Sequence, residues 1–130
     1  MSESLSVFSI FPVPLKKVYE AWMDSDEHTA FTNSEAKIDS RVGGEFSAWE
    51  GYITGKTISL EPFTRIVQSW RTTDFNADDP DSLLEIILEP MDSGCKVTIN
   101  HSGLPDGRKD EFVQGWEDYY FAPMRGYFTK

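Results

Sequence analysis

The segment EGYITGKT, residues 50 to 57, ends in the Gly-Lys-Thr of a nucleotide-binding phosphate loop. Such a loop places four residues between its first glycine and Gly-Lys-Thr, and a helix follows it. Here only three residues separate Gly51 from Gly55, and residues 57–62 alternate apolar and polar side chains before a proline, which is typical of a strand. We therefore expect no phosphate site. The glycines are expected to permit turns, bulges and bends.

A second pattern, in residues 74–85, resembles a calcium-binding loop. Asp74, Asn76, Asp78 and Glu85 match the first, third, fifth and twelfth positions of that loop. The sixth position requires glycine for a sharp turn, but Asp79 occupies it and a proline follows. The flanking residues also favour strands over the helices of an EF-hand. We expect a solvated acidic hairpin loop and no metal site.

The remaining reactive side chains form no catalytic group in the sequence. The two histidines, His28 and His101, are far apart and lack the spacing of a zinc motif. His101 could act as a general base if a substrate reached it, but a hydrogen-bonded histidine at the edge of the core is the commoner case. Ser102 is adjacent to His101 on a strand and so faces the other way. Cys95 has no cation on its own face and is expected to be inert. We expect no enzymatic activity and no cofactor.

Composition restricts the remaining functions. The 130 residues are expected to form one domain, 1–130, because 39% are hydrophobic and 14% are aromatic. A net charge of −10 without a basic cluster disfavours nucleic acid. No stretch approaches the length of a membrane span, and the first residues lack the pattern of a signal peptide. A single cysteine fits a reducing compartment, so we expect a cytoplasmic protein.

Periodicity predicts the elements that position these side chains. Residues 5–11 read as a strand, Pro14 opens a helix that ends near Met23, and Ser25 is expected to cap a second short helix over 26–31. Strands are expected at 35–39, 45–50, 52–61, 64–72, 83–89 and 95–101, separated by turn residues, which predicts an antiparallel meander. A final helix over 110–128 should be interrupted at Pro123, and its stripe Phe112, Trp116, Tyr119, Pro123 and Tyr127 should face the sheet.

Strand alternation predicts which side chains point inward. Leu84, Ile86 and Leu88 share one face of their strand, and Val97, Ile99 and His101 share one face of the next. A curved sheet around one long helix leaves a space that is either a packed core or a ligand cavity. The expected fold class is α+β.

Five short motifs carry a family resemblance that extends from about Val18 to Phe128. They are Ala30-Phe31-Thr32, Gly43-Gly44-x-Phe46, Gly51-x-Ile53-x-Gly55, Ile66-Val67-Gln68-x-Trp70-Arg71 and Gly115-Trp116-x-x-Tyr119-Tyr120-Phe121. In this order and spacing the chain resembles the family of activators of heat-shock protein 90 ATPase, specifically the activator's C-terminal domain. The resemblance implies a START-like helix-grip fold, in which a curved antiparallel sheet grips a long C-terminal helix. The activator's N-terminal domain, which supplies its main contact with the chaperone, has no counterpart in these residues.

The resemblance leaves two hypotheses open. The first is a non-enzymatic module that binds a small apolar ligand in a central cavity; the residues expected near that cavity are Phe31, Phe46, Trp49, Trp70, Ile86, Val97, Ile99, His101, Phe112, Trp116 and Tyr120. The alternative is that these aromatic side chains fill the core and bind no ligand. The second hypothesis is a co-chaperone that binds heat-shock protein 90 and modulates its ATPase. Catalysis, known for some proteins of this fold, is the weakest reading because no acid and base pair is evident.

Overall fold

A computed structural model describes residues 3–129 of the chain, and it contains one antiparallel sheet of seven strands. Strand β1 (Glu3–Phe11) precedes helices α1 (Leu15–Met23) and α2 (Ser25–Thr32). The strands β2 (Lys37–Ile38), β3 (Glu45–Ala48), β4 (Ile53–Glu61), β5 (Arg65–Thr72), β6 (Ser82–Met91) and β7 (Gly94–Leu104) follow. The final helix contains α3 (Lys109–Trp116), a π-helical turn η1 (Glu117–Phe121) and α4 (Ala122–Phe128).

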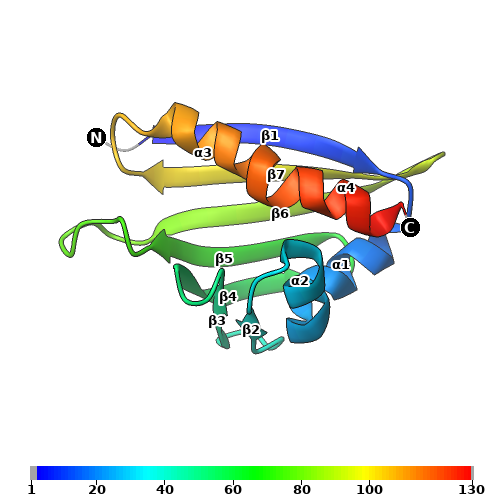
Figure 1. The fold of residues 1–130 in the computed structure, drawn as a ribbon, viewed down its shortest axis with the longest axis horizontal. Helices are drawn as coiled ribbons and strands as arrows, with labels where there is room; N and C mark the ends of the chain where they lie inside the picture. Colours follow the sequence, from blue (N-terminus) through cyan, green and yellow to red (C-terminus); the bar gives the residue numbers. More distant parts are fainter. Residues whose placement is uncertain (1–2, 130) are drawn as a thin grey trace.

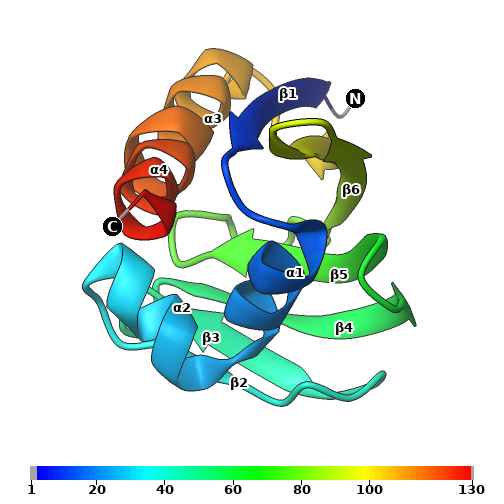
Figure 2. The same ribbon diagram turned by 90° about the vertical axis from the view of Figure 1, so that its right-hand side faces the viewer.

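The sheet has the order β1-β7-β6-β5-β4-β3-β2 and curves around the helices. Figure 1 shows the final helix lying across one face of the sheet, and Figure 2 shows the same sheet bending around that helix and around α1 and α2. Every neighbouring pair of strands is antiparallel, and only β1 is paired out of chain order, with β7. The α+β helix-grip fold expected from the sequence is confirmed.

Alternation along the central strands fixes the core. Leu84, Ile86 and Leu88 are buried toward the helix, as are Val97 and Ile99, while Glu85 lies on the opposite face. The burial of apolar side chains such as these is the main favourable contribution to the free energy of folding. The inward parity predicted from the sequence is therefore confirmed on both strands.

The glycines of residues 43–55 serve turns and close packing. Gly43 and Gly51 have φ angles of 85° and 88°, which side-chain-bearing residues adopt at a cost. Gly55 lies in β4, and a Cβ there would stand 1.9 Å from the Ser69 carbonyl oxygen and 2.7 Å from the Phe46 ring. Only a residue without a side chain fits between strand β5 and Phe46. The segment that resembles a phosphate loop is a hairpin.

Helix α2 is capped differently from the sequence expectation. Asp24, not Ser25, is the N-cap, and its carboxylate accepts a hydrogen bond from the Glu27 amide at 2.8 Å. Ser25 is the first helical residue, and its Oγ accepts from the Ile38 amide at 2.7 Å. The Ser25 hydroxyl therefore holds β2 against α2.

The interruption expected at Pro123 takes the form of the π turn η1. Pro123 has no amide hydrogen to donate to the carbonyl one turn earlier, and its ring crowds that carbonyl. The Ala122 amide bonds to the Glu117 carbonyl, five residues back, which inserts one residue into the turn. The buried face therefore shifts after Trp116: Tyr120, Phe121 and Met124 are buried, whereas Tyr119 is 59% exposed. The prediction that Tyr119 faces the sheet was wrong for this reason.

Candidate functional site

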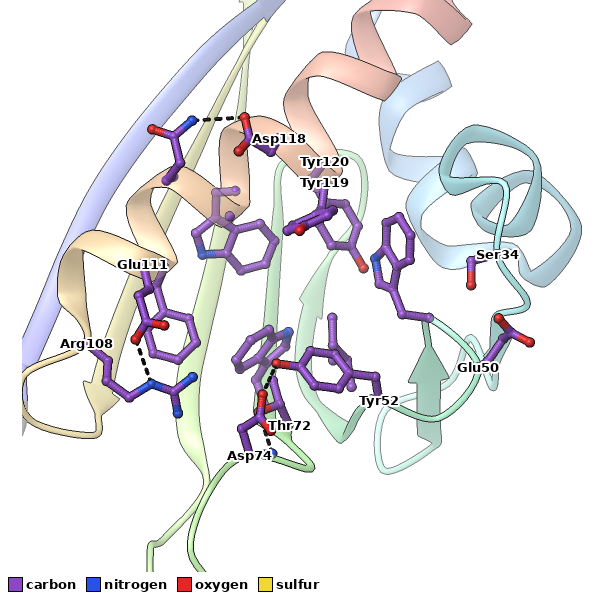
Figure 3. A pocket seen from close by; sticks show the side chains of 17 residues that line it. Ser34, Glu50, Tyr52, Thr72, Asp74, Arg108, Glu111, Asp118, Tyr119 and Tyr120 are labelled. Carbon is purple, nitrogen blue, oxygen red and sulfur yellow. Dashed lines mark hydrogen bonds and ion pairs between the residues drawn. The ribbon is translucent and has the colours of Figure 1, made fainter.

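A half-open cleft of about 620 Å³ lies between the final helix and the β3–β4 side of the sheet. Figure 3 shows the side chains that line it. Its walls come from the β3–β4 turn, from β5 and the loop after it, and from α3 and η1. Seven of its lining residues are aromatic: Trp49, Tyr52, Trp70, Phe112, Trp116, Tyr119 and Tyr120. The size lies within the range of roughly 300–1,000 Å³ that small-molecule sites occupy.

The floor of the cleft is formed by rings that support one another. The Trp70 and Trp116 ring centroids are 5.8 Å apart, and Phe112 packs edge-on against Trp70 at the same centroid distance. On the other side Tyr120 lies 5.0 Å from Trp116. Because these four residues are buried, the floor is rigid and apolar.

His101 lies beneath this floor in a closed hydrogen-bond chain. The Trp116 indole donates to His101 Nδ1 at 3.2 Å, so the ring proton belongs on Nε2, which contacts Ser82 Oγ at 2.8 Å. The Ser82 hydroxyl donates in turn to the Trp70 carbonyl at 2.6 Å. Burial lowers the pKa of His101 to about 3. His101 Nε2 is therefore a donor to Ser82 and cannot accept the serine proton, so the pair is not an activated nucleophile.

His28 makes a second closed arrangement. Its Nδ1 donates to the Trp22 carbonyl at 3.0 Å, which leaves Nε2 to accept from the Tyr120 hydroxyl at 3.0 Å. Burial lowers the pKa of His28 to about 4, against the opposing effect of the Trp22 carbonyl. Burial also raises the pKa of Tyr120 well above its ordinary value. Both groups are neutral at physiological pH and link α1, α2 and η1.

Trp49, in the cleft wall, has an unfavourable backbone conformation and an indole N–H without a good hydrogen-bond acceptor. Its backbone is left-handed, with φ of 55°, and Glu50 and Gly51 continue the left-handed turn. Among the described residues, its Nε1 is the one buried side-chain polar atom without a well-formed hydrogen bond, although it lies near enough to the Tyr120 hydroxyl to oppose part of the rise in that group's pKa. The ring packs edge-on against Tyr119, with centroids 5.6 Å apart.

The rim of the cleft is polar and consists of Glu50, Tyr52, Asp74, Arg108, Glu111 and Asp118. Tyr52 donates to Asp74 at 2.6 Å, and Arg108 Nε donates to Glu111 at 2.9 Å. Burial, followed by the hydrogen bond to Asp74, raises the pKa of Tyr52, whereas Glu111 raises the pKa of Arg108. Tyr52 and Arg108 therefore keep their protons at physiological pH.

The acidic loop that resembles a calcium site holds a guanidinium group. Arg71 Nη1 donates to Asp81 at 2.8 Å and to the Asp79 carbonyl at 3.0 Å, and Nη2 donates to the Asn76 carbonyl at 3.1 Å. Within residues 3–129 no cluster of three or more histidine, cysteine or carboxylate side chains could hold a metal ion. Cys95, the second residue of β7, is buried in the core, and this burial raises the pKa of its thiol.

The residues expected near the cavity divide into two groups. Those that line the cleft are Trp49, Trp70, Phe112, Trp116 and Tyr120. Those that lie in the core or at another surface are Phe31, Phe46, Ile86, Val97, Ile99 and His101. Phe31 packs against Tyr120 from α2, and Phe46 lies beneath Gly55.

Sequence reasoning did not place the rim at the cleft. Tyr52 was expected to begin a strand but lies in the turn before β4, and Asp74 was considered only as part of a calcium-like loop. Arg108 lies at the start of a helix, where no periodicity marks it. Gly115 and Glu111 are different. Gly115 follows Phe112 by three residues in α3, and Glu111 precedes Gly115 by four, so the three residues share one face of the helix. Helical spacing could have placed those two beside the cleft.

Comparison with known proteins identifies the family. The family model described as "Activator of Hsp90 ATPase homolog 1-like protein" matches residues 12–129. The chain belongs to this family. Among curated relatives, the human activator of 90 kDa heat shock protein ATPase homolog 1 is 25% identical over 87% of this chain and 33% of its own length. The Saccharomyces cerevisiae Hsp90 co-chaperone AHA1 is 24% identical over 95% of this chain and 37% of its own. The chain thus spans about a third of these relatives.

Solved structures show the same fold. An HSP90 activator from Plasmodium falciparum superposes with a TM-score of 0.84 at 23% identity, covering 92% of this chain and 91% of that one. A Chromobacterium violaceum protein superposes with a TM-score of 0.79 at 24% identity, covering 98% and 97% of the two chains. No helix within the described residues is long and apolar enough to cross a membrane.

Proposed function

We propose that this helix-grip domain is a cytoplasmic, non-enzymatic module that binds a small, largely apolar molecule in the aromatic cleft. The observation that carries the proposal is the cleft itself, a space of about 620 Å³ with a rigid floor of buried rings. Small-molecule sites are clefts of this kind, lined mainly by aromatic and other apolar side chains with a few polar groups. The helix-grip fold leaves this cleft open between α3–η1 and the β3–β4 turn.

The strained wall of the cleft supports the same proposal. A tryptophan in the left-handed region costs roughly 1–3 kcal/mol, and such strain gathers at binding sites. Trp49 combines this backbone with a buried indole N–H that lacks a good acceptor. A bound molecule that packs against Trp49 and Tyr119 would stabilise both rings by contact.

Gly115 allows a direct test of the cleft. It lines the cleft from α3, and a Cβ there would meet only Tyr119, at 3.9 Å. Gly115→Leu should therefore fold normally while its side chain fills the space. Gly126→Leu is the matched control, because Gly126 is exposed on α4 and a Cβ there meets nothing within 4 Å.

The measurement is a fluorescence titration with the neutral probe N-phenylnaphthylamine, accompanied by native mass spectrometry of the gently purified protein. We expect the unaltered protein and Gly126→Leu to bind the probe alike, and Gly115→Leu to bind at least about tenfold more weakly, a loss of about 1.4 kcal/mol. Circular dichroism would establish that both variants are folded. Equal binding by both variants, or no binding and a bare mass for the unaltered protein, would reject the cleft as a ligand site.

A second candidate function is binding to heat-shock protein 90 as a co-chaperone that modulates its ATPase. The relatives named as activators of that chaperone support it, and the chain covers about a third of their length. A single domain lacks the avidity of two linked modules, so modest affinity is expected. With a net charge of −10, binding to a basic patch should weaken as salt is raised.

This candidate is tested by titrating labelled protein with heat-shock protein 90 from the same organism, with and without a non-hydrolysable ATP analogue, while the ATPase rate is followed. Nucleotide-dependent, salt-sensitive binding would support a minimal co-chaperone. The Gly115→Leu variant is included in this titration, and unaltered chaperone binding by it would place the chaperone-binding surface outside the cleft. An absence of binding at high micromolar concentration would exclude the candidate.

A further inference from the structure

The cleft that we propose as the ligand site has an unbalanced charge. Among residues 3–129, four carboxylates line it, from Glu50, Asp74, Glu111 and Asp118, whereas Arg108 is the one lining cation. The Arg108 guanidinium is already paired with Glu111 at 2.9 Å. The lining therefore carries a net charge of −3 in a protein whose overall charge is −10.

The carboxylates come from separate elements. Glu50 belongs to the β3–β4 turn, Asp74 to the loop after β5, and Glu111 and Asp118 to the final helix. In the view of Figure 3 they lie on different sides of the group of rings. A charge held within the cleft would therefore experience the field of all four at once.

The rings supply the complementary surface. The face of a tryptophan, tyrosine or phenylalanine ring carries negative charge, and a cation within about 6 Å of the ring centre is attracted to it. Sites that recognise quaternary ammonium groups combine several such rings. Tyr52 does not add charge to the rim, because burial, followed by the hydrogen bond to Asp74, raises the pKa of its hydroxyl and keeps it protonated.

We infer that the cleft selects an organic cation, an alkylated ammonium group attached to an apolar body. This inference rests on the proposed ligand-binding function and names the chemical class of the ligand. The apolar body would pack on the floor formed by Trp70, Phe112 and Trp116, and the ammonium group would lie among the rings and the carboxylates of the rim. An anionic ligand of the same shape would be repelled by the rim.

The test compares two molecules of the same shape: para-trimethylammonio benzyl alcohol and para-tert-butyl benzyl alcohol, which differ in a charged nitrogen or a neutral carbon. Binding is measured by calorimetry, and the chemical shift of the Trp49 indole N–H locates it. At low salt we expect the cation to bind about tenfold more tightly than its neutral counterpart, and we expect the difference to shrink as salt is raised.

Charge variants distinguish the effect of the carboxylates at the cleft from the effect of the net charge of the whole protein. Glu50→Gln with Asp118→Asn removes two exposed carboxylates from the rim, whereas Glu89→Gln with Asp92→Asn removes two exposed carboxylates near the β6–β7 turn, away from the cleft. The rim variant should lose at least about threefold in affinity for the cation and keep its affinity for the neutral molecule. The control variant should keep both.

The outcomes distinguish this inference from the proposed function. Equal or tighter binding of the neutral molecule, with a shift at Trp49, would overturn the preference for a cation and leave ligand binding intact. An equal loss in the rim and control variants would show a long-range effect of net charge and would also overturn it. Binding of neither molecule would count against the cleft as a ligand site.

Discussion

The two histidines show how single residues are fixed by their partners. His101 is held between Trp116 and Ser82, and His28 between the Trp22 carbonyl and Tyr120, so each ring has one donor and one acceptor satisfied. A buried polar group without such partners costs roughly 1–3 kcal/mol. Both histidines therefore stabilise the packing around the cleft in their neutral form, and neither is available for proton transfer.

The free energy of unfolding should therefore decrease in mild acid. In the unfolded chain both histidines have a pKa of 6.5, while burial lowers the folded-state pKa to about 4 for His28 and about 3 for His101. Between the folded-state and unfolded-state pKa values, the unfolded chain binds more protons than the folded protein. The stability that is present above pH 6.5 is therefore lost as the pH falls toward 4. Each histidine should contribute up to about 1.4 kcal/mol per pH unit.

Urea unfolding at about pH 6 and about pH 5 measures this slope above most carboxylate titration. His101→Gln should reduce the slope by about half, since only two histidines are present. A slope unchanged by His101→Gln would contradict the assignment of the acid sensitivity to this buried ring.

At the scale of elements, the shape of the cleft depends on two local irregularities. The π turn before Pro123 presents Tyr119 and Tyr120 in succession at the cleft, one exposed and one buried. The left-handed turn at residues 49–51 brings Trp49 and Tyr52 to the opposite wall. Neither wall would exist in a regular helix or in a two-residue hairpin.

Gly55 is expected to be indispensable for the β4–β5 pair. In Gly55→Ala the new Cβ would lie 1.9 Å from the Ser69 carbonyl oxygen, so the backbone must move. We expect a loss of about 3 kcal/mol or more in the free energy of unfolding, at or above the upper end of ordinary overpacking. Denaturant unfolding monitors the change.

Gly126→Ala is the comparison for this variant. Its Cβ meets nothing within 4 Å in α4, so removal of a helical glycine should raise stability by up to about 1 kcal/mol. A cost of less than 1 kcal/mol for Gly55→Ala would show that the strands separate easily at this position.

At the scale of the whole molecule, one core joins the sheet and all the helices. The buried cluster runs from Leu5 in β1 through Trp22 in α1 and Ile86 in β6 to Met124 in α4. The first strand of the chain pairs with the last, β1 with β7, and the sheet stays open with β1 and β2 at its edges. Segments from both ends of the chain therefore share this core.

The chain should therefore unfold in one cooperative transition, as a single domain. Tryptophan fluorescence reports on residues near the cleft and on α1, while far-ultraviolet circular dichroism reports on the whole sheet and the helices. The two signals should give the same denaturant midpoint and the same slope. Separate midpoints would reveal a second folding unit.

The elements, the inward faces of β6 and β7, and the family could all be predicted from the amino-acid sequence. These follow from alternation, turn residues and ordered motifs, all of which are local properties of the chain. Five of the residues expected near a cavity line the cleft. Phe112 and Trp116 belong to the helical stripe expected from period, whereas Trp49 and Tyr120 lie in a turn and in η1.

The position of the cleft and the residues that surround it could not be predicted in this way, because they follow from the packing of distant segments. Its rim joins Tyr52, Asp74, Arg108 and Asp118, which are distant in the sequence and come together only when the sheet bends around the helix. Pro123 predicted an interruption of the final helix, but the sequence did not predict that the interruption would be a π turn that leaves Tyr119 exposed. Such features depend on contacts between segments, which no local pattern records.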